Sequence, residues 1–144
     1  MIRQRFTLPR YDWRVYAYYI VTKPYADEIL DALAHIGCTG EDMARAYDNL
    51  MSGKCDTGLT YSNCDMRETV MVFARTTSAK EFQQSYQHEV GHLKDHITQA
   101  FGISPHGEEL QYIGDDIVDA TWEIAKDLLC DCCRKNEGAV YCKY

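Results

Sequence analysis

Five consecutive residues, His88-Glu89-Val90-Gly91-His92, have the types and the spacing that a catalytic zinc site requires. On a helix, residues four positions apart lie on the same face, so His88 and His92 can direct two imidazole nitrogens at one metal ion. Neutral imidazoles suit Zn²⁺, and catalytic zinc usually keeps three protein ligands and one position for water. Glu89 lies where its carboxylate can take a proton from that water and create a hydroxide-like nucleophile. We therefore expect a zinc-binding pair, His88 and His92, with Glu89 as the general base.

The surrounding residues predict one long helix over 78–101. Ser78, followed three residues later by Glu81, is a capping-box signal for the start of a helix. Apolar residues then recur at steps of three and four and form one core-facing stripe, which consists of Phe82, Tyr86, Val90, Leu93, Ile97 and Phe101. At about 100° per residue, His88 and His92 point away from this stripe. A histidine that only fills the core would lie on the stripe, so the remaining alternative for the pair is an exposed polar face.

A third zinc ligand is expected from the segment that follows this helix. Residues 102–107 contain glycine and proline and break the helix, and a last helix is predicted from about 104 or 107 to about 133. After so short a connection the two long helices must run antiparallel. This arrangement would bring Glu108 and Glu109 toward the face that carries His88 and His92, and either carboxylate can complete the site.

The rest of the chain predicts an α+β fold in a single domain of 144 residues. Residues 13–22, rich in aromatic and β-branched side chains, predict a strand, and apolar periodicity predicts helices over 25–36 and from 39 to about 50. Residues 57–62 and 68–75 predict a hairpin at the edge of a small antiparallel sheet. We expect the helix over 78–101 to lie between this sheet and the last helix, and the residues after about 134 to be loosely held.

Composition and charge limit the classes of partner. Hydrophobic residues make up 46% of the chain, and the formal charge is −7. Because nucleic acids and anionic membranes attract basic surfaces, neither is an expected partner. No apolar run near the N-terminus suggests a secretory signal, and no stretch approaches the roughly 20 apolar residues of a membrane-spanning helix. The expected location is the cytoplasm, and the sequence indicates no particular oligomeric state.

Seven cysteines are present: Cys38, Cys55, Cys64, Cys130, Cys132, Cys133 and Cys142. We expect reduced thiols, because the number is odd and no secretory signal is recognised. Cys130, Cys132 and Cys133, together with Cys142, can form a second metal site, but their spacing matches no common zinc knuckle. Buried or tail thiols are the more ordinary interpretation.

Several segments match a pattern that extends beyond the histidine motif. They are Gly-Leu-Thr-Tyr-Ser-Asn at 58–63, Arg67, Thr-Thr-Ser at 76–78, Glu-Phe at 81–82, His-Glu-Val-Gly-His-Leu at 88–93 and Gly-Glu-Glu-Leu-Gln-Tyr-Ile-Gly at 107–114. Together they resemble small zincin-like metallopeptidases of phage and prophage regions of gut bacteria. The resemblance covers about residues 57–120 well and the first fifty in outline. It implies the gluzincin arrangement, with a glutamate ligand one helical turn before a tyrosine. That glutamate maps onto Glu108, four residues before Tyr112, with Glu109 as the alternative.

The resemblance also implies a function and a substrate class. It implies a zinc metallopeptidase that hydrolyses a peptide bond in a peptide or protein, and the strand over 68–75 would bind an extended peptide at the sheet edge. Tyr112, His96 and His106 are the candidates for stabilising the oxyanion, and His96 can instead be a fourth ligand or a surface residue. The alternative function is a non-catalytic, zinc-stabilised interaction module of a phage or mobile element.

Overall fold

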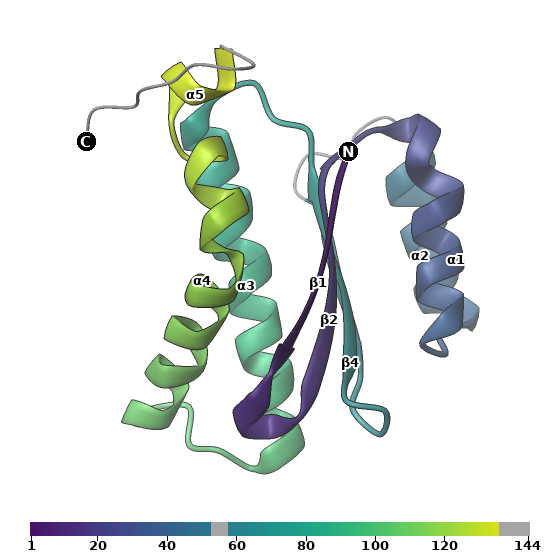
Figure 1. The fold of residues 1–144 in the computed structure, drawn as a ribbon. Coiled ribbons are helices and arrows are strands. Elements are labelled where there is room, and N and C mark those ends of the chain that lie inside the picture. The colour runs from purple at the N-terminus through teal and green to yellow at the C-terminus, as the bar shows by residue number, and fades with distance from the viewer. Residues whose placement is uncertain (53–57, 136–144) are drawn as a thin grey trace.

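The computed structural model describes residues 1–52 and 58–135 and has an α+β fold built on one sheet (Figure 1). The sheet has the strand order β1-β2-β4-β3, with β1 (Ile2–Leu8), β2 (Trp13–Val21), β3 (Leu59–Asn63) and β4 (Glu68–Ala74). β1 pairs antiparallel with β2, and β3 pairs antiparallel with β4, but the two central strands, β2 and β4, run parallel. The sheet is therefore mixed, which corrects the expectation of an antiparallel sheet.

The parallel pairing of β2 and β4 follows from the long connection between them. Parallel neighbours need a crossover, and here it contains α1 (Ala26–His35) and α2 (Gly40–Met51), which cover one face of the sheet (Figure 1). Side chains alternate along the strands, so Val70 and Val72 of β4 contact the core beneath α1 and α2. Met71 and Phe73 belong to the core on the opposite face.

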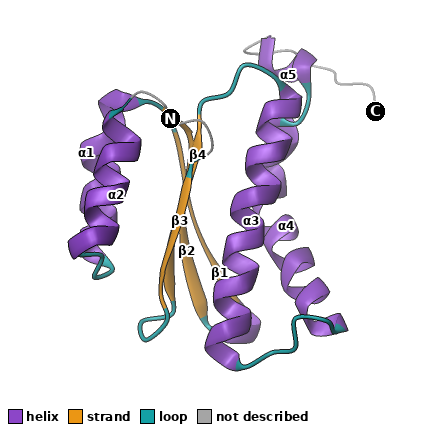
Figure 2. Cartoon of the chain, turned by 180° about the vertical axis from the view of Figure 1, so that it is seen from behind, coloured by secondary structure: helices purple, strands orange, loops and turns teal. Residues whose placement is uncertain are grey.

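Two long helices, α3 (Ala79–Phe101) and α4 (Glu108–Leu128), cover that opposite face side by side (Figures 1 and 2). α3 packs on β3 and β4, whereas α4 packs on β1 and on α3. The predicted contact between the two helices is confirmed. The expectation that α3 would lie between the sheet and the last helix is wrong, because both helices contribute apolar residues to the same core against the sheet.

The start of α3 is formed as its capping residues predict. The Ser78 hydroxyl accepts a hydrogen bond from the Glu81 backbone N–H, at 3.2 Å. The Glu81 carboxylate in turn accepts from the backbone N–H and hydroxyl of Thr77, at 2.9 and 2.8 Å. Five of the six stripe residues are buried, whereas Phe101 is 39% exposed. The helix ends at Gly102, whose φ of 63° lies in the left-handed region that favours glycine.

Three further features differ from the predictions: the presence of β1, the position of β4 in the sheet and the end of α4. No strand was predicted where β1 lies. The strand at 68–75 was predicted at the sheet edge, but β4 is internal and buried along its whole length. The edge strand of that hairpin is β3. α4 ends at Leu128, and a separate short helix, α5 (Asp131–Lys135), follows it. The tail from 136, with Cys142, lies outside the described residues, as does Cys55.

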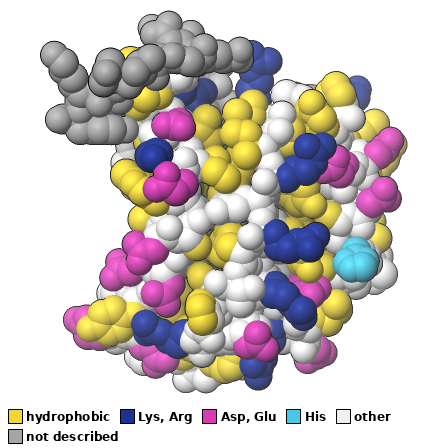
Figure 3. Space-filling model, in the orientation of Figure 1, with side chains coloured by type: hydrophobic (Ala, Val, Ile, Leu, Met, Phe, Trp, Pro, Cys, Tyr) yellow, Lys and Arg dark blue, Asp and Glu magenta, His cyan; other side chains and the backbone are white. Residues whose placement is uncertain are grey.

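The surface carries charges of both signs. Figure 3 shows one face, on which basic side chains gather along the β1 side of the sheet and acidic side chains lie mainly on the helices to either side. Within the described part of the chain, no helix combines the length and the apolar character needed to cross a membrane.

Candidate metal centre

His88 and His92 lie one turn apart on the exposed side of α3. Their Nε2 atoms are 3.1 Å apart, and the two rings are nearly perpendicular, at 86°. Two nitrogens bound to one tetrahedral zinc at their usual bond lengths are about 3.3 Å apart. The pair is therefore within a few tenths of an ångström of the spacing that a shared zinc ion requires.

Glu89 lies on the inner side of the same turn and is only 2% exposed. The Thr60 hydroxyl of β3 donates a hydrogen bond of 2.6 Å to its Oε2 atom. Burial raises the pKa of Glu89, while the Thr60 hydrogen bond and the charges of His92 and His88 act in the opposite direction. A buried carboxyl whose pKa is raised by burial, adjacent to two potential metal ligands, is a candidate general base.

β3 lies beside this turn and is an edge strand, with β4 as its neighbour in the sheet. Because an edge strand leaves one row of backbone N–H and C=O groups available for pairing, it can accept a further strand. The predicted peptide-binding strand at 68–75 is internal and cannot take this role. The edge strand, which was predicted to be β4, is β3. β3 also contains Thr60, which hydrogen-bonds Glu89.

His96 is half-buried and anchored to the sheet through a chain of hydrogen bonds. Its Nδ1 atom lies 2.7 Å from the Ser62 hydroxyl, which lies 2.7 Å from the Thr69 hydroxyl. Trp13 Nε1 donates to Thr69 Oγ1 at 2.8 Å, and an indole can only donate. Because the Thr69 hydroxyl oxygen can accept two hydrogen bonds, these distances fit a neutral His96 whose Nδ1 either accepts from Ser62 or donates to it. Burial lowers the pKa of His96, which favours this neutral form.

Glu108 and Glu109 occupy the first turn of α4. The Tyr11 hydroxyl donates a hydrogen bond of 2.7 Å to Glu109 Oε1, and Glu108 is exposed. Burial, with this hydrogen bond to Glu109, raises the pKa of Tyr11 to about 12. The first turn of α4 follows the end of α3, and from His92 to Phe101 that helix rises about 14 Å. The structure therefore does not bring either glutamate to the histidine pair.

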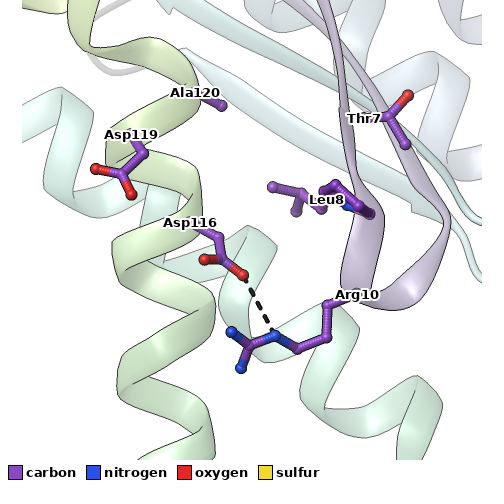
Figure 4. Close-up of a pocket in the computed structure, with 7 residues that line it drawn as sticks. Thr7, Leu8, Arg10, Asp116, Asp119 and Ala120 are labelled. Carbon is purple, nitrogen blue, oxygen red and sulfur yellow. Dashed lines mark ion pairs between the residues drawn. The ribbon is translucent and has the colours of Figure 1, made fainter.

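The other candidate oxyanion groups also lie near the start of α4. The Arg10 guanidinium lies over the Tyr112 ring, 5.6 Å from its centroid, and Arg10 Nε is 3.6 Å from Asp116 Oδ2. Figure 4 shows this ion pair at a hollow of about 500 Å³ between α4 and the end of β1. His106 is exposed in the turn before α4. Of the three candidates, the structure shows only His96 hydrogen-bonded to β3. Thr60 of the same strand hydrogen-bonds Glu89.

A second group of potential ligands lies after α4. The sulfur atoms of Cys130, Cys132 and Cys133 are all within 4.8 Å of one another. Among the residues that the structure describes, this is the only group of three or more His, Cys, Asp or Glu side chains whose ligand atoms are so close. It can hold a metal ion such as zinc. Ordinary thiols were the expected interpretation of these cysteines. The Cys-Asp-Cys-Cys run at 130–133 was the sequence signal of the three-thiol group.

No protein-family model, curated protein or solved structure matches this chain. The functional argument therefore depends on the residues of the two candidate sites and their geometry.

Proposed function

We propose that the protein is a zinc-dependent peptidase of the gluzincin type, in a minimal zincin-like fold. The observation that carries the proposal is the convergence of the His88 and His92 Nε2 atoms, 3.1 Å apart, beside the buried carboxylate of Glu89. A structural zinc ion needs no such carboxylate. A hydrolytic one needs a group that accepts the proton of the attacking water.

The proposed roles follow from the contacts of each side chain. A bound zinc ion would polarise the scissile carbonyl and lower the pKa of a water molecule. Glu89 would accept a proton from the attacking water and return it to the leaving amine, while the Thr60 hydroxyl holds Oε2 and leaves Oε1 for proton transfer. His96, with hydrogen on Nε2, is the proposed donor to the oxyanion. Its ring centroid lies 6.3 Å from that of His92.

Glu108 is the proposed third ligand, and Glu109 is the alternative. The resemblance maps the ligand onto Glu108, and the hydrogen bond from Tyr11 already engages Glu109. Binding by Glu108 requires the first turn of α4 to approach the histidine pair. This requirement makes the assignment testable separately from the roles of His88 and His92.

The proposed substrate is an extended segment of a peptide or protein. Such a segment would pair with the free edge of β3, because that strand has β4 on its other side and lies beside α3. Pairing there would place the peptide along the strand whose Thr60 contacts Glu89 and whose Ser62 contacts His96.

A second candidate function is a zinc-stabilised interaction module without catalysis. The hydrogen bond between Thr60 and Glu89 favours it, because this bond also joins α3 to the sheet edge and needs no reaction to explain it. The two candidates differ in one outcome. A module binds zinc through the histidine pair but cleaves no peptide.

The test measures zinc content and cleavage of a diverse peptide library for the wild type, His88→Ala and His92→Ala. His35→Ala is the matched control, because His35 is an exposed histidine on α1, outside the pair. The peptidase proposal expects each of the first two variants to bind one zinc ion fewer than the wild type and to lose cleavage, and the control to match the wild type in both. Wild-type protein that binds the zinc ion lost in these variants but cleaves nothing would support the module, and unchanged zinc content in both variants would exclude zinc at the pair.

A further inference from the structure

The segment after α4 carries three thiols to the N-terminal end of α3. Cys130 Sγ lies 3.0 Å from Cys132 Sγ, and Cys133 completes a group whose sulfur atoms are all within 4.8 Å of one another. The backbone N–H of Ala79, the first residue of α3, donates a hydrogen bond of 2.8 Å to Asp131 Oδ1, next to these cysteines. From Ala79 to His88 the helix rises about 14 Å. The three thiols are therefore separate from the histidine pair.

The sulfur spacing suits a shared metal ion. Two thiolates bound to one tetrahedral zinc at the usual bond length are about 3.8 Å apart. The observed range, from 3.0 Å to at most 4.8 Å, includes this value, so small side-chain rotations suffice to bind an ion. A disulfide requires about 2.05 Å between sulfurs, well below the distance between Cys130 and Cys132.

Two polar contacts hold this segment in place on either side of the thiols. Asp131 accepts the hydrogen bond from Ala79 at the start of α3. Arg134 donates through Nη2 to the carbonyl and hydroxyl oxygens of Thr76, and through Nη1 to the Leu128 carbonyl. The backbone around the cysteines is therefore fixed against both long helices. An ion bound there would not have to order the segment first.

Two sources of positive charge adjoin the segment that carries the three cysteines. The N-terminus of α3 carries a partial positive charge, and the Arg134 guanidinium follows directly after the last of the three cysteines. All three residues are at least partly accessible to solvent, so an ion can reach them. Soft thiolate ligands select zinc over hard ions such as Mg²⁺ or Ca²⁺.

We propose that Cys130, Cys132 and Cys133 form a second zinc site, in the segment that leads into α5 and lies at the start of α3. Three thiolates bind the ion, and the fourth position is open to water or to an external ligand. Binding releases the thiol protons, so affinity falls as the pH is lowered. This inference does not depend on the proposed peptidase function.

The test is a titration of the full, reduced chain with Co²⁺, followed by Zn²⁺. Cobalt bound by thiolates gives an intense sulfur-to-metal charge-transfer band in the near ultraviolet, which imidazole ligands do not produce. We expect this band in the wild type, in the His88→Ala/His92→Ala double variant and in Cys64→Ser, which lacks an exposed thiol outside the group. We expect its loss in the Cys130→Ser/Cys132→Ser/Cys133→Ser variant and its disappearance when Zn²⁺ displaces cobalt.

A measurement on the wild type alone guards against a triple variant that fails to fold. Alkylation of the reduced protein, mapped by mass spectrometry with and without Zn²⁺, should show protection of Cys130, Cys132 and Cys133 but not of Cys64. The inference is overturned if the charge-transfer band is absent, if it persists in a folded triple variant, or if zinc leaves the three thiols as reactive as Cys64.

Discussion

Replacing Thr60 with valine removes the one hydroxyl that the structure shows donating to the Glu89 carboxylate, with almost no change in side-chain volume. Glu89 is 2% exposed, and the hydrogen bond is 2.6 Å long. A hydrogen bond to a charged group contributes about 1.5–3 kcal/mol, and a carboxylate left buried without its donor loses most of that contribution. We therefore expect Thr60→Val to lower the free energy of unfolding by about 2 kcal/mol, which corresponds to a melting temperature lower by about 6–8 °C for a chain of this size.

The assay is denaturation of chelator-treated protein near neutral pH, with Thr60→Ser as the matched control. Serine keeps the hydroxyl and should retain most of the stability, whereas valine keeps the β-branched shape and should not. Peptide cleavage by the zinc-loaded protein should fall about 10- to 100-fold in Thr60→Val, because Glu89 loses the contact that orients it. If serine destabilises as much as valine, or if valine changes neither stability nor cleavage, the hydroxyl does not position Glu89.

Three further outcomes follow from the candidate site. Glu89→Gln should retain zinc, while its cleavage rate should fall about 10²- to 10⁴-fold, with both quantities measured on the same samples. Activity equal to that of the wild type would show that Glu89 is not the general base. Because burial lowers the pKa of His96, the folded state binds its proton less readily, so stability should fall as the pH drops below the unfolded pKa of about 6.5. In His96→Gln, denaturation curves between neutral and mildly acidic pH should show a smaller fall. Glu108→Gln should weaken zinc binding at the histidine pair more than Glu109→Gln, as calorimetry can measure, and the reverse order would move the ligand by one residue.

The local elements could be predicted because their signals lie within a few residues of one another. The capping pair Ser78 and Glu81 and the apolar stripe placed α3 within one residue of its observed start. The hairpin of β3 and β4 was likewise predicted from two short runs and the loop between them. β1 was not predicted, although Phe6 and Leu8 alternate with Arg5 and Thr7, because this stretch has no continuous apolar run and its alternation is short.

The errors concern pairings between residues that are far apart in the chain. The run at 68–75 has five consecutive apolar residues, 70–74, a pattern typical of an internal strand that is buried on both faces. The run does not say which strand lies beside it, and the crossover through α1 and α2 makes that neighbour β2. The same limit applied to the metal sites. The four-residue spacing of His88 and His92 specifies their convergence, whereas the position of Glu109 depends on Tyr11, a residue of the connection between β1 and β2. Local spacing thus predicted that two imidazoles would converge and could not place the carboxylate.

The hydrogen bond from Tyr11 to Glu109 also offers a way to separate the two candidate glutamates. Tyr11 is 8% exposed, and Tyr11→Phe removes only its hydroxyl, so the Glu109 carboxylate is released without a change of shape. If Glu109 is the ligand, zinc no longer competes with this bond, which contributes about 1.5–3 kcal/mol, and the affinity of the histidine pair should rise by about tenfold or more. If Glu108 is the ligand, as proposed, zinc affinity should change little in Tyr11→Phe and fall in Glu108→Gln. Calorimetric titration of the reduced protein measures zinc affinity in both variants. Cys130, Cys132 and Cys133 are replaced by serine in these samples, so that only zinc binding at the histidine pair is measured. A rise in affinity in Tyr11→Phe would refute the assignment of Glu108.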